Sequence, residues 1–381
     1  MKRFVFTLLV IMLVSGSIFA ACAAPAPTPT PVPTPTPPPV QKLAPTAEKP
    51  LELKFSYHSP PQSGLAQKML KGWSSAIESD AKGRIKITHY GGESLVKLND
   101  QYDALISGLS DIGQVATDAT PGRFVLSGIN QLPYLFPTAR LGGRVYNELL
   151  LKYAADTEWK EAKILWCPAL SPHQLFSNKQ VQKLEDFKGM KIRIEGRVEG
   201  WTAEALGAAG AELSTPDLQQ ALERGTVDGC FLQWAGALTF GIQQVTKHRT
   251  ELNIFSRSFV VAMSRKLWDQ LPTDIQLILD QYSSPTRSEF YSAQYEVDVV
   301  GARGAIAGFD TKAGNPGIVV PSAEEAARIR NAAMPVREKW VAEAEAKKLP
   351  ARAMLNDAVA LVAKYAPMQI PLPAPPPPAA K

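Results

Sequence analysis

Few side chains in this chain could act as nucleophiles, bases or metal ligands. Its 381 residues include three cysteines and four histidines, and they contain no Gly-x-Ser-x-Gly elbow, His-Glu-x-x-His pair, phosphate-cradling glycine loop or Cys-x-x-Cys pair. One enzymatic interpretation stays open, a nucleophile formed by Cys167 or Cys230 with His173 in a cleft. Apart from that alternative, the sequence predicts no catalytic residue, no metal site and no cofactor.

A different chemistry is suggested by Arg193, which lies in a run where Lys191 and Arg193 alternate with Ile192 and Ile194. A carboxylate buried in a closing cleft needs a cation that offers two parallel donors and stays charged, which arginine does and lysine does not. The same alternation is typical of a strand whose charged face lies in water. The run therefore indicates either a carboxylate-binding arginine or a solvated strand face.

A sequence motif that occurs twice indicates the fold in which this strand lies. Ala104-Leu105-x-x-Gly108-x-x-Asp111 is matched 117 positions later by Ala221-Leu222-x-x-Gly225-x-x-Asp228. In each copy the glycine suits the left-handed position that ends a helix, and the aspartate falls in the turn before a strand, where it would bond backbone amides. Two such units predict two α/β lobes with a cleft between them, and a cleft usually binds a small molecule.

The elements around the two copies predict one lobe each. In the first, strands at 51–57, 85–87 and 112–116 alternate with helices at 65–77 and 99–108. In the second, strands are expected at 191–194 and 227–232, and a small-residue helix at 202–209. Gly210 would stop that helix, and Thr215 with Pro216 would open the next one as its cap and first residue.

The rest of the chain is predicted to return to both lobes. Further elements are expected as a strand at 259–263 and as helices at 267–282, broken at Pro272, and at 287–307, 323–347 and 351–364. The helix at 287–307 is long enough to cross between the lobes. The first lobe would then comprise residues 51–171 and 258–297, and the second lobe residues 172–257 and 298–366. Several crossings permit a hinge motion.

The N-terminus is predicted to be an export signal. Residues 1–21 have a basic start at Lys2 and Arg3, an apolar run and small residues before Cys22. Cys22 resembles the lipid-anchored cysteine of a bacterial lipobox, although Phe19 stands where leucine is usual, so cleavage with release stays open. The proline- and threonine-rich residues 22–50 would form a stiff tether of roughly 80 Å or a passive tail, and residues 367–381 a disordered tail.

Composition excludes some partners. The formal charge of +5 comes without a basic tract interleaved with aromatic residues, so no nucleic-acid binding is predicted. No second long apolar run follows the signal, so nothing else is expected to span a membrane. Cys167 and Cys230 could form one disulfide or stay as two buried thiols.

Three motifs carry a resemblance to a known family. LEDFKGMKIR at 184–193, GTVDG at 225–229 and KLWDQLP at 266–272 resemble the DctP-type solute receptors of tripartite ATP-independent periplasmic (TRAP) transporters, over about residues 51–365. The resemblance implies an α/β, two-lobe periplasmic-binding-protein-like fold with a central ligand cleft, crossing strands and a long inter-lobe helix. Such a receptor closes on an organic acid and presents it to a membrane permease.

The resemblance also assigns residues to the cleft. Arg193 matches the arginine that clamps the ligand carboxylate, and His173 stands where many relatives have a second arginine. Where relatives have glutamine, glutamate and asparagine after VDG, this chain has Cys230, Phe231 and Leu232. A pocket with these apolar replacements would accept a monocarboxylate with an apolar or aromatic body.

Gln233 and Trp234 follow directly, and some relatives have a tryptophan nearby. Both are predicted to line the cleft together with Phe231. The alternatives are core packing for Phe231 and Trp234, since aromatic stripes usually belong to a core, and a solvated position for Gln233.

Loops at strand ends supply the remaining candidates for the ligand site. Such loops are where α/β proteins bind ligands. The candidates are Ser59, Gln114 and Thr117 in the first lobe and Phe255 and Ser258 near the return crossing.

Two further residues near the expected cleft are given other roles. His58 is a weaker candidate for the ligand site, and its alternative role is a loop histidine bonded to backbone. Glu195 is interpreted as a solvated partner or a hinge residue.

The expected partners are a small carboxylate, TRAP permease subunits and the outer face of a membrane reached through Cys22. A second interpretation keeps the binding but changes its purpose, because a lipoprotein could hand its ligand to a sensor kinase instead. The physics of the cleft is the same in both cases. A neighbouring pair of permease genes would indicate transport, and a histidine-kinase gene would indicate sensing.

Overall fold

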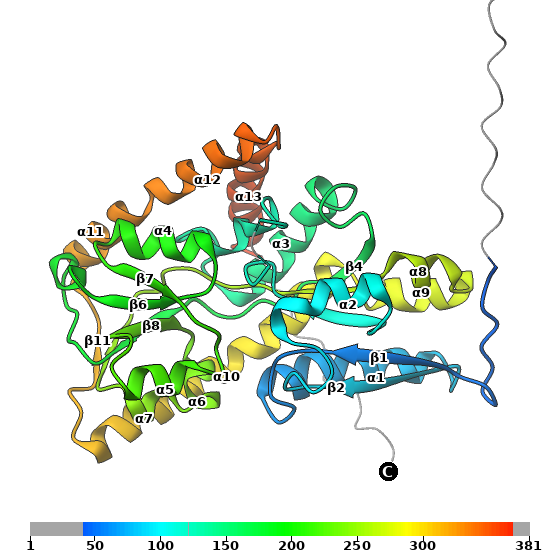
Figure 1. The fold of residues 1–381 in the computed structure, drawn as a ribbon, viewed down its shortest axis with the longest axis horizontal. Coiled ribbons are helices and arrows are strands. Elements are labelled where there is room, and N and C mark those ends of the chain that lie inside the picture. The colour runs from blue at the N-terminus through cyan, green and yellow to red at the C-terminus, as the bar shows by residue number, and fades with distance from the viewer. Residues whose placement is uncertain (1–40, 121, 369–381) are drawn as a thin grey trace, which may run out of the picture. The chain divides into compact units, whose positions relative to one another are not determined.

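The computed structural model describes residues 41–120 and 122–368. The predicted signal segment, Cys22, most of the tether and almost all of the predicted C-terminal tail lie outside these ranges. In the described part, the strands form two separate sheets (Figure 1). None of the helices there is both long and apolar enough to cross a membrane.

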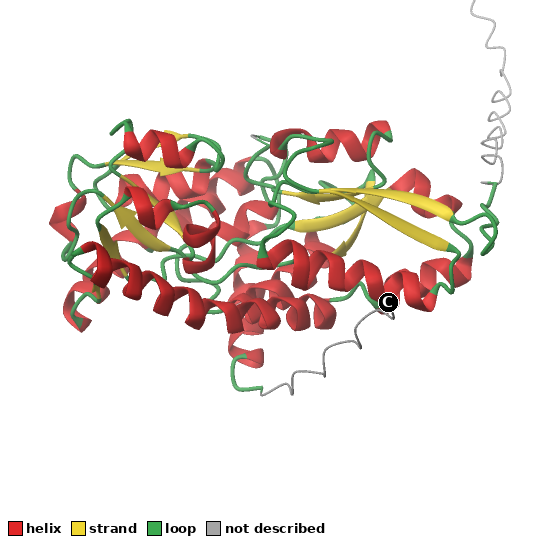
Figure 2. Ribbon diagram, turned by 90° about the horizontal axis from the view of Figure 1, so that it is seen from below, coloured by secondary structure: helices red, strands yellow, loops and turns green. Residues whose placement is uncertain are grey.

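The first sheet has five strands in the order β2-β1-β3-β10-β4. Their bounds are Leu51–Ser56 for β1, Ile85–Tyr90 for β2, Ile112–Val115 for β3, Ala162–Trp166 for β4 and Val260–Ser264 for β10. Val260 and Ala262 pack into one core cluster and Val261 and Met263 into another, as expected for a strand covered on both faces. Figure 2 shows helices on both sides of these strands.

The second sheet has six strands in the order β11-β9-β5-β8-β6-β7. They are β5 (Gln174–Ser177), β6 (Lys191–Ile194), β7 (Ala209–Glu212), β8 (Gly229–Leu232), β9 (His248–Thr250) and β11 (Ile318–Val319). The two sheets match strand by strand from one edge. A parallel trio (β2-β1-β3 or β7-β6-β8) is followed by an antiparallel neighbour, β10 or β5. We call the parts around the first and second sheets the first and second lobes.

The helices before and between these strands are short. They are the π-helix η1 (Leu65–Leu70), α1 (Lys71–Asp80), α2 (Gln101–Ser107), α3 (Ala139–Tyr153), α4 (Arg197–Ala205), α5 (Leu218–Glu223), α6 (Trp234–Thr239) and α7 (Ile242–Val245), with 3₁₀ turns η2 (Leu98–Asp100), η3 (Ser127–Gln131) and η4 (Leu184–Phe187). After the last long strand come α8 (Arg265–Gln270), α9 (Thr273–Gln281), α10 (Pro285–Ala313), α11 (Ala323–Ala333), α12 (Pro335–Ala346) and α13 (Ala351–Tyr365).

The duplicated motif has the same structure in both lobes, as predicted. Gly108 and Gly225 have φ of 77° and 68°, which is the left-handed conformation that ends α2 and precedes β8. Asp111 accepts the backbone N–H of Lys54 at 2.8 Å. Asp228 accepts that of Lys191, also at 2.8 Å. Each aspartate thus ties the turn before a strand to the neighbouring parallel strand.

The chain crosses between the lobes at two antiparallel segments and along one helix. Leu170 and His173, on the segment from β4 to β5, donate backbone N–H groups to the carbonyls of Arg257 and Phe255 on the segment from β9 to β10. The predicted long helix is α10, which has 29 residues. Its N-terminal half buries Tyr291 and Tyr295 in a core of the first lobe, and later residues pack in a core of the second lobe.

Three local expectations are corrected. The helix expected at 202–209 is α4, which ends before Gly207 (φ 95°), so Gly210 lies in β7 instead of stopping a helix. Thr215 does not cap α5, because its hydroxyl bonds elsewhere. Residues of α12 and α13, placed in the second lobe by sequence, pack in the same core as α3 of the first lobe.

We expect Asp228→Ala to lower the free energy of unfolding by about 1.5–3 kcal/mol at pH 7, the usual value of a hydrogen bond to a charged group. Burial would raise the pKa of Asp228, but the N–H of Lys191 and the ammonium of Lys179 hold it below its ordinary value. A lowered carboxyl pKa stabilises the fold above about pH 4, and that contribution is lost as the pH falls further.

Denaturant unfolding at pH 7 and at pH 3 measures the difference in unfolding free energy between the wild type and Asp228→Ala. It should shrink at pH 3, where the aspartate of the wild type is losing its charge. Asp103→Ala is the matched control, because Asp103 forms an exposed ion pair with Arg123 that should contribute at most about 1 kcal/mol. Equal losses in the two variants would contradict the role assigned to Asp228.

Candidate functional site

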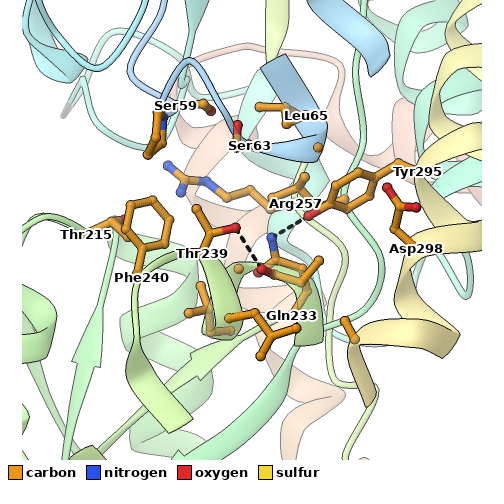
Figure 3. Close-up of a pocket in the computed structure, with 18 of the residues that line it drawn as sticks. Ser59, Ser63, Leu65, Thr215, Gln233, Thr239, Phe240, Arg257, Tyr295 and Asp298 are labelled. Carbon is orange, nitrogen blue, oxygen red and sulfur yellow. Dashed lines mark hydrogen bonds between the residues drawn. The ribbon is translucent and has the colours of Figure 1, made fainter. Parts of the chain in front are cut away.

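A cavity of about 370 Å³ lies between the two lobes. Its walls come from the loop after β1 and the start of η1, from both crossing segments, from β8 and α6, and from the middle of α10. The apolar part of the lining includes Leu65, Leu170, Leu232, Leu238, Phe240 and Phe259. The polar part includes Ser59, Ser63, Thr215, Gln233, Thr239, Arg257, Tyr295 and Asp298 (Figure 3). This volume suits a small organic molecule.

Arg257 is the cation in the wall of this cavity, and the sequence analysis did not single it out. It lies on the return crossing, and Figure 3 shows its guanidinium between Ser59 and Thr215. Its Nε lies 2.7 Å from Asp118 Oδ2 and its Nη2 donates to Asp118 Oδ1 at 2.9 Å. Its Nη1 donates to Glu195. Its position in the chain, between the predicted cleft residues Phe255 and Ser258, is the one feature of the sequence that points to Arg257 as a site residue.

Arg193 lies one layer behind the wall of the cavity. Its side chain is 1% exposed, so the solvated interpretation holds for Lys191 but not for Arg193. Nε donates to the carbonyl of Leu213 at 2.9 Å, and Nη2 donates to Thr215 Oγ1 at 2.8 Å and pairs with Glu195. Thr215 itself lines the cavity, so a single hydroxyl connects Arg193 to the space where a ligand would bind.

Glu195 is buried between the two arginines, which corrects its interpretation as a solvated residue. One carboxylate oxygen accepts the hydroxyl of Thr215 and pairs with Arg193, and the other accepts from Arg257. Burial would raise the pKa of Glu195, but the two guanidinium groups lower it to about 2. Since Glu195 follows β6 in the second lobe and Asp118 follows β3 in the first, Arg257 connects the lobes through charges.

The histidines at the site are neutral. Burial and the charge of Arg257 lower the pKa of His58 to about 4 and that of His173 to about 3. The ring of His173 lies over Phe255 at 5.0 Å, and its Nδ1 is 3.2 Å from the Phe255 carbonyl. Both histidines line the cavity as polar, uncharged groups.

Of the residues predicted for the ligand site, Ser59, His173 and Gln233 line the cavity. Gln233 Nε2 donates to the Tyr295 hydroxyl at 3.1 Å, which ties the second lobe to α10 (Figure 3). Gln233 is buried, so the solvated alternative is wrong for it. Whether these side chains bind a ligand stays a prediction.

The predicted aromatic wall is placed in the core instead. Phe231 packs edge-on to Phe255 in one core of the second lobe, and Trp234 packs edge-on to Phe176 in another. None of these rings is among the residues that line the cavity. Because side chains alternate along β8, Leu232 faces the cavity when Phe231 does not.

The other loop candidates lie close to the cavity without lining it. Gln114 is fully buried and its amide has no hydrogen-bond partner among the described residues. Thr117 lines a second cavity of about 280 Å³, beside Asp118. The Ser258 carbonyl accepts a hydrogen bond from the Asn130 side chain. Ser258 also forms a β-bridge with Ala169, which joins the two crossing segments.

Cys167 and Cys230 are separate, buried thiols, so the disulfide alternative is wrong. Burial raises the pKa of Cys230 to about 12 and that of Cys167 well above its ordinary value. A thiol that stays protonated is a weak nucleophile. The Cys-His alternative therefore finds no activated cysteine at this site.

Two lobes of similar build, joined by crossing strands and a long helix around a cavity, define a two-lobed solute-binding protein. Residues 55–344 match the family model of the bacterial extracellular solute-binding proteins of family 7, DctP. The chain belongs to this family, which comprises the solute-binding proteins of TRAP transporters. The match confirms the resemblance and the fold class inferred from sequence.

Known relatives agree with this assignment. A TRAP solute-binding protein from Rhodoferax ferrireducens, crystallised with copurified benzoate, is 27% identical, with a TM-score of 0.78 over 83% of this chain and 98% of its own. One from Bordetella bronchiseptica with bound mandelate has 24% identity, a TM-score of 0.75, and 83% and 99% coverage. The C4-dicarboxylate-binding periplasmic protein DctP of Rhodobacter capsulatus is 25% identical over 62% of this chain and 72% of its own.

Proposed function

We propose that this protein is the extracytoplasmic receptor of a TRAP transporter that captures a monocarboxylate with an apolar or aromatic body. The two lobes close on the acid and the receptor delivers it to the membrane permease, while Cys22 anchors the exported chain to the membrane. The observation that carries the proposal is the composition of the cavity, where a buried guanidinium faces apolar walls.

The geometry favours one orientation for the ligand. The carboxylate would lie at the end of the cavity formed by Arg257 and Thr215, with Arg193 behind them. The apolar body would lie against the apolar part of the lining, of which Phe259 packs against Arg257 itself, with the guanidinium carbon 4.9 Å from the ring centroid. Leu232 supports this arrangement, because an aliphatic side chain there provides no polar contact for a second carboxylate.

Benzoate in the relative from Rhodoferax ferrireducens supports an aromatic ligand, whereas the Rhodobacter capsulatus relative is named for C4-dicarboxylates. The cavity of the present chain agrees better with the first. At one end Arg257 faces the cavity, and at the other Asp298, which forms an ion pair with Lys68, provides no second cation for a carboxylate. The proposed ligand therefore carries a single carboxylate.

A thermal-shift screen tests this proposal. We expect benzoate and other aromatic, aliphatic or keto monocarboxylates to raise the melting temperature, because a ligand at a hundredfold its Kd stabilises the native state by about 2.7 kcal/mol. Succinate serves as the dicarboxylate comparison, neutral sugars as the comparison without a carboxylate, and amino acids as the comparison whose carboxylate is accompanied by an ammonium group. A shift confined to succinate, sugars or amino acids would show that the ligand class is wrong.

A further inference from the structure

The charges around Glu195 balance before any ligand enters. Both oxygens of Glu195 accept hydrogen bonds or ion pairs from Arg193, Arg257 and Thr215. Both oxygens of Asp118 face donors as well, from Arg257 and from Gln131 at 2.7 Å. Donors on all sides favour the ionised form of a carboxylate, although burial raises the pKa of Asp118 against the opposing charge of Arg257. Two guanidinium groups therefore face two carboxylates, and all four residues are buried, with at most 9% exposed.

The other ionisable groups around Glu195 are uncharged near neutral pH. Glu199 on α4 has one oxygen that accepts the N–H of Glu195 at 2.9 Å and another that is buried without a partner, as expected for a protonated acid. Burial raises the pKa of Glu199 to about 8. His58 and His173 are neutral, and so is the thiol of Cys230 on β8.

A carboxylate ligand would upset this balance. Placed against Arg257, it would bring a third negative charge to two positive ones among buried side chains. An uncompensated buried charge is expensive, and the group gains or loses a proton instead. Carboxylates that share one site likewise hold one proton between them.

We infer that Glu195 is an internal counter-anion whose presence obliges this receptor to take up about one proton with each monocarboxylate it captures. The inference rests on the proposed function. The ligand carboxylate competes with Glu195 for Arg193 and Arg257, and the proton is shared among the ligand, Glu195 and Asp118. Glu195 thereby makes capture of an acid stronger in acidic surroundings and weaker in alkaline ones.

The test is calorimetric titration of benzoate into the wild-type protein in phosphate and in Tris buffer at pH 7.5. The dependence of the observed enthalpy on the ionisation enthalpy of the buffer counts the protons taken up, and we expect about one. Between pH 5.5 and pH 7, below the pKa of about 8 of Glu199, the Kd should rise by about tenfold per pH unit, as linkage to one proton requires.

Glu195→Gln removes the extra negative charge and keeps an oxygen for Thr215. This variant should bind benzoate with close to zero proton uptake, a Kd that is flat from pH 5.5 to pH 7, and tighter binding than the wild type at pH 7. Glu223→Gln, on an exposed position of α5, is the matched control and should behave as the wild type.

Each result has a separate meaning. Binding of benzoate by the wild type without proton uptake overturns the inference and leaves the proposed function intact. Wild-type pH dependence that persists in Glu195→Gln overturns it as well. If the wild type binds no benzoate at any pH between 5 and 9, the aromatic-acid proposal fails and the inference with it. The wild-type proton count decides the question even if Glu195→Gln does not fold.

Discussion

Replacing Arg193 with lysine is expected to weaken benzoate binding by about thirty- to a hundredfold while the protein still folds. The guanidinium holds the carbonyl of Leu213, the hydroxyl of Thr215 and the carboxylate of Glu195 in three fixed directions. Lysine keeps the charge but not the planar fork. The loss of one or two hydrogen bonds to a charged group costs about 2–3 kcal/mol, and each 1.4 kcal/mol is about tenfold in Kd.

Isothermal titration measures the affinity, and the melting temperature of the unliganded protein reports the fold. Arg249→Lys is a matched control, because Arg249 is equally buried in the same lobe and pairs with Asp310 away from the cavity. It should lower stability without a change in Kd. An unchanged Kd for Arg193→Lys would mean that another group holds the carboxylate.

The second large effect is expected from Gly196→Ala. Gly196 has φ of 83° and ψ of 171°, a conformation essentially restricted to glycine, at the start of α4. A Cβ there would lie 2.9 Å from both the Cβ and the backbone oxygen of Asp118 in the first lobe. Such a contact must push the two loops apart, so the lobes cannot approach as they do here. We expect benzoate affinity to fall by about five- to 150-fold, because holding the two loops together against this contact costs about 1–3 kcal/mol.

Gly225→Ala separates strain from lobe contact. Gly225 also has a positive φ, 68°, but no heavy atom lies within 4 Å of the position that its Cβ would take. This variant should lose stability, by about 1 kcal/mol, and keep the wild-type Kd. The Kd comes from the same titration, and the free energy of unfolding from denaturant experiments. Wild-type affinity in Gly196→Ala would show that the contact between these loops does not matter for binding.

The sequence led to residues at or beside the cavity where local neighbours define their positions, and their binding roles stay predictions. Arg193 was identified by the alternation of β6 and by its motif, and the structure buries it beside the cavity. Ser59 and Gln233 follow strand ends and line the cavity as expected. Arg257 and Thr215 were missed because nothing local distinguishes a cleft arginine or a cleft hydroxyl from a surface arginine or a helix cap.

Phe231 and Leu232 illustrate the same limit. The alternation of β8 requires these neighbours to face opposite sides of the sheet, and the sequence establishes that much. Which side meets the other lobe depends on how the sheets are set against each other. The packing directs Leu232 to the cavity and Phe231 to Phe255 in the core, so Phe231 does not take the cleft position predicted for it.

By itself, the sequence determined the two α/β units, because left-handed glycines, turn aspartates and alternating strands act over a few residues. It also determined the family, through motifs that are contiguous in the chain. Only the tertiary structure decided that Asp118, Glu195 and Arg257, from three separate segments, share one buried network. Their charges are compensated only by groups far away in sequence, so their role exists only once the lobes are packed together.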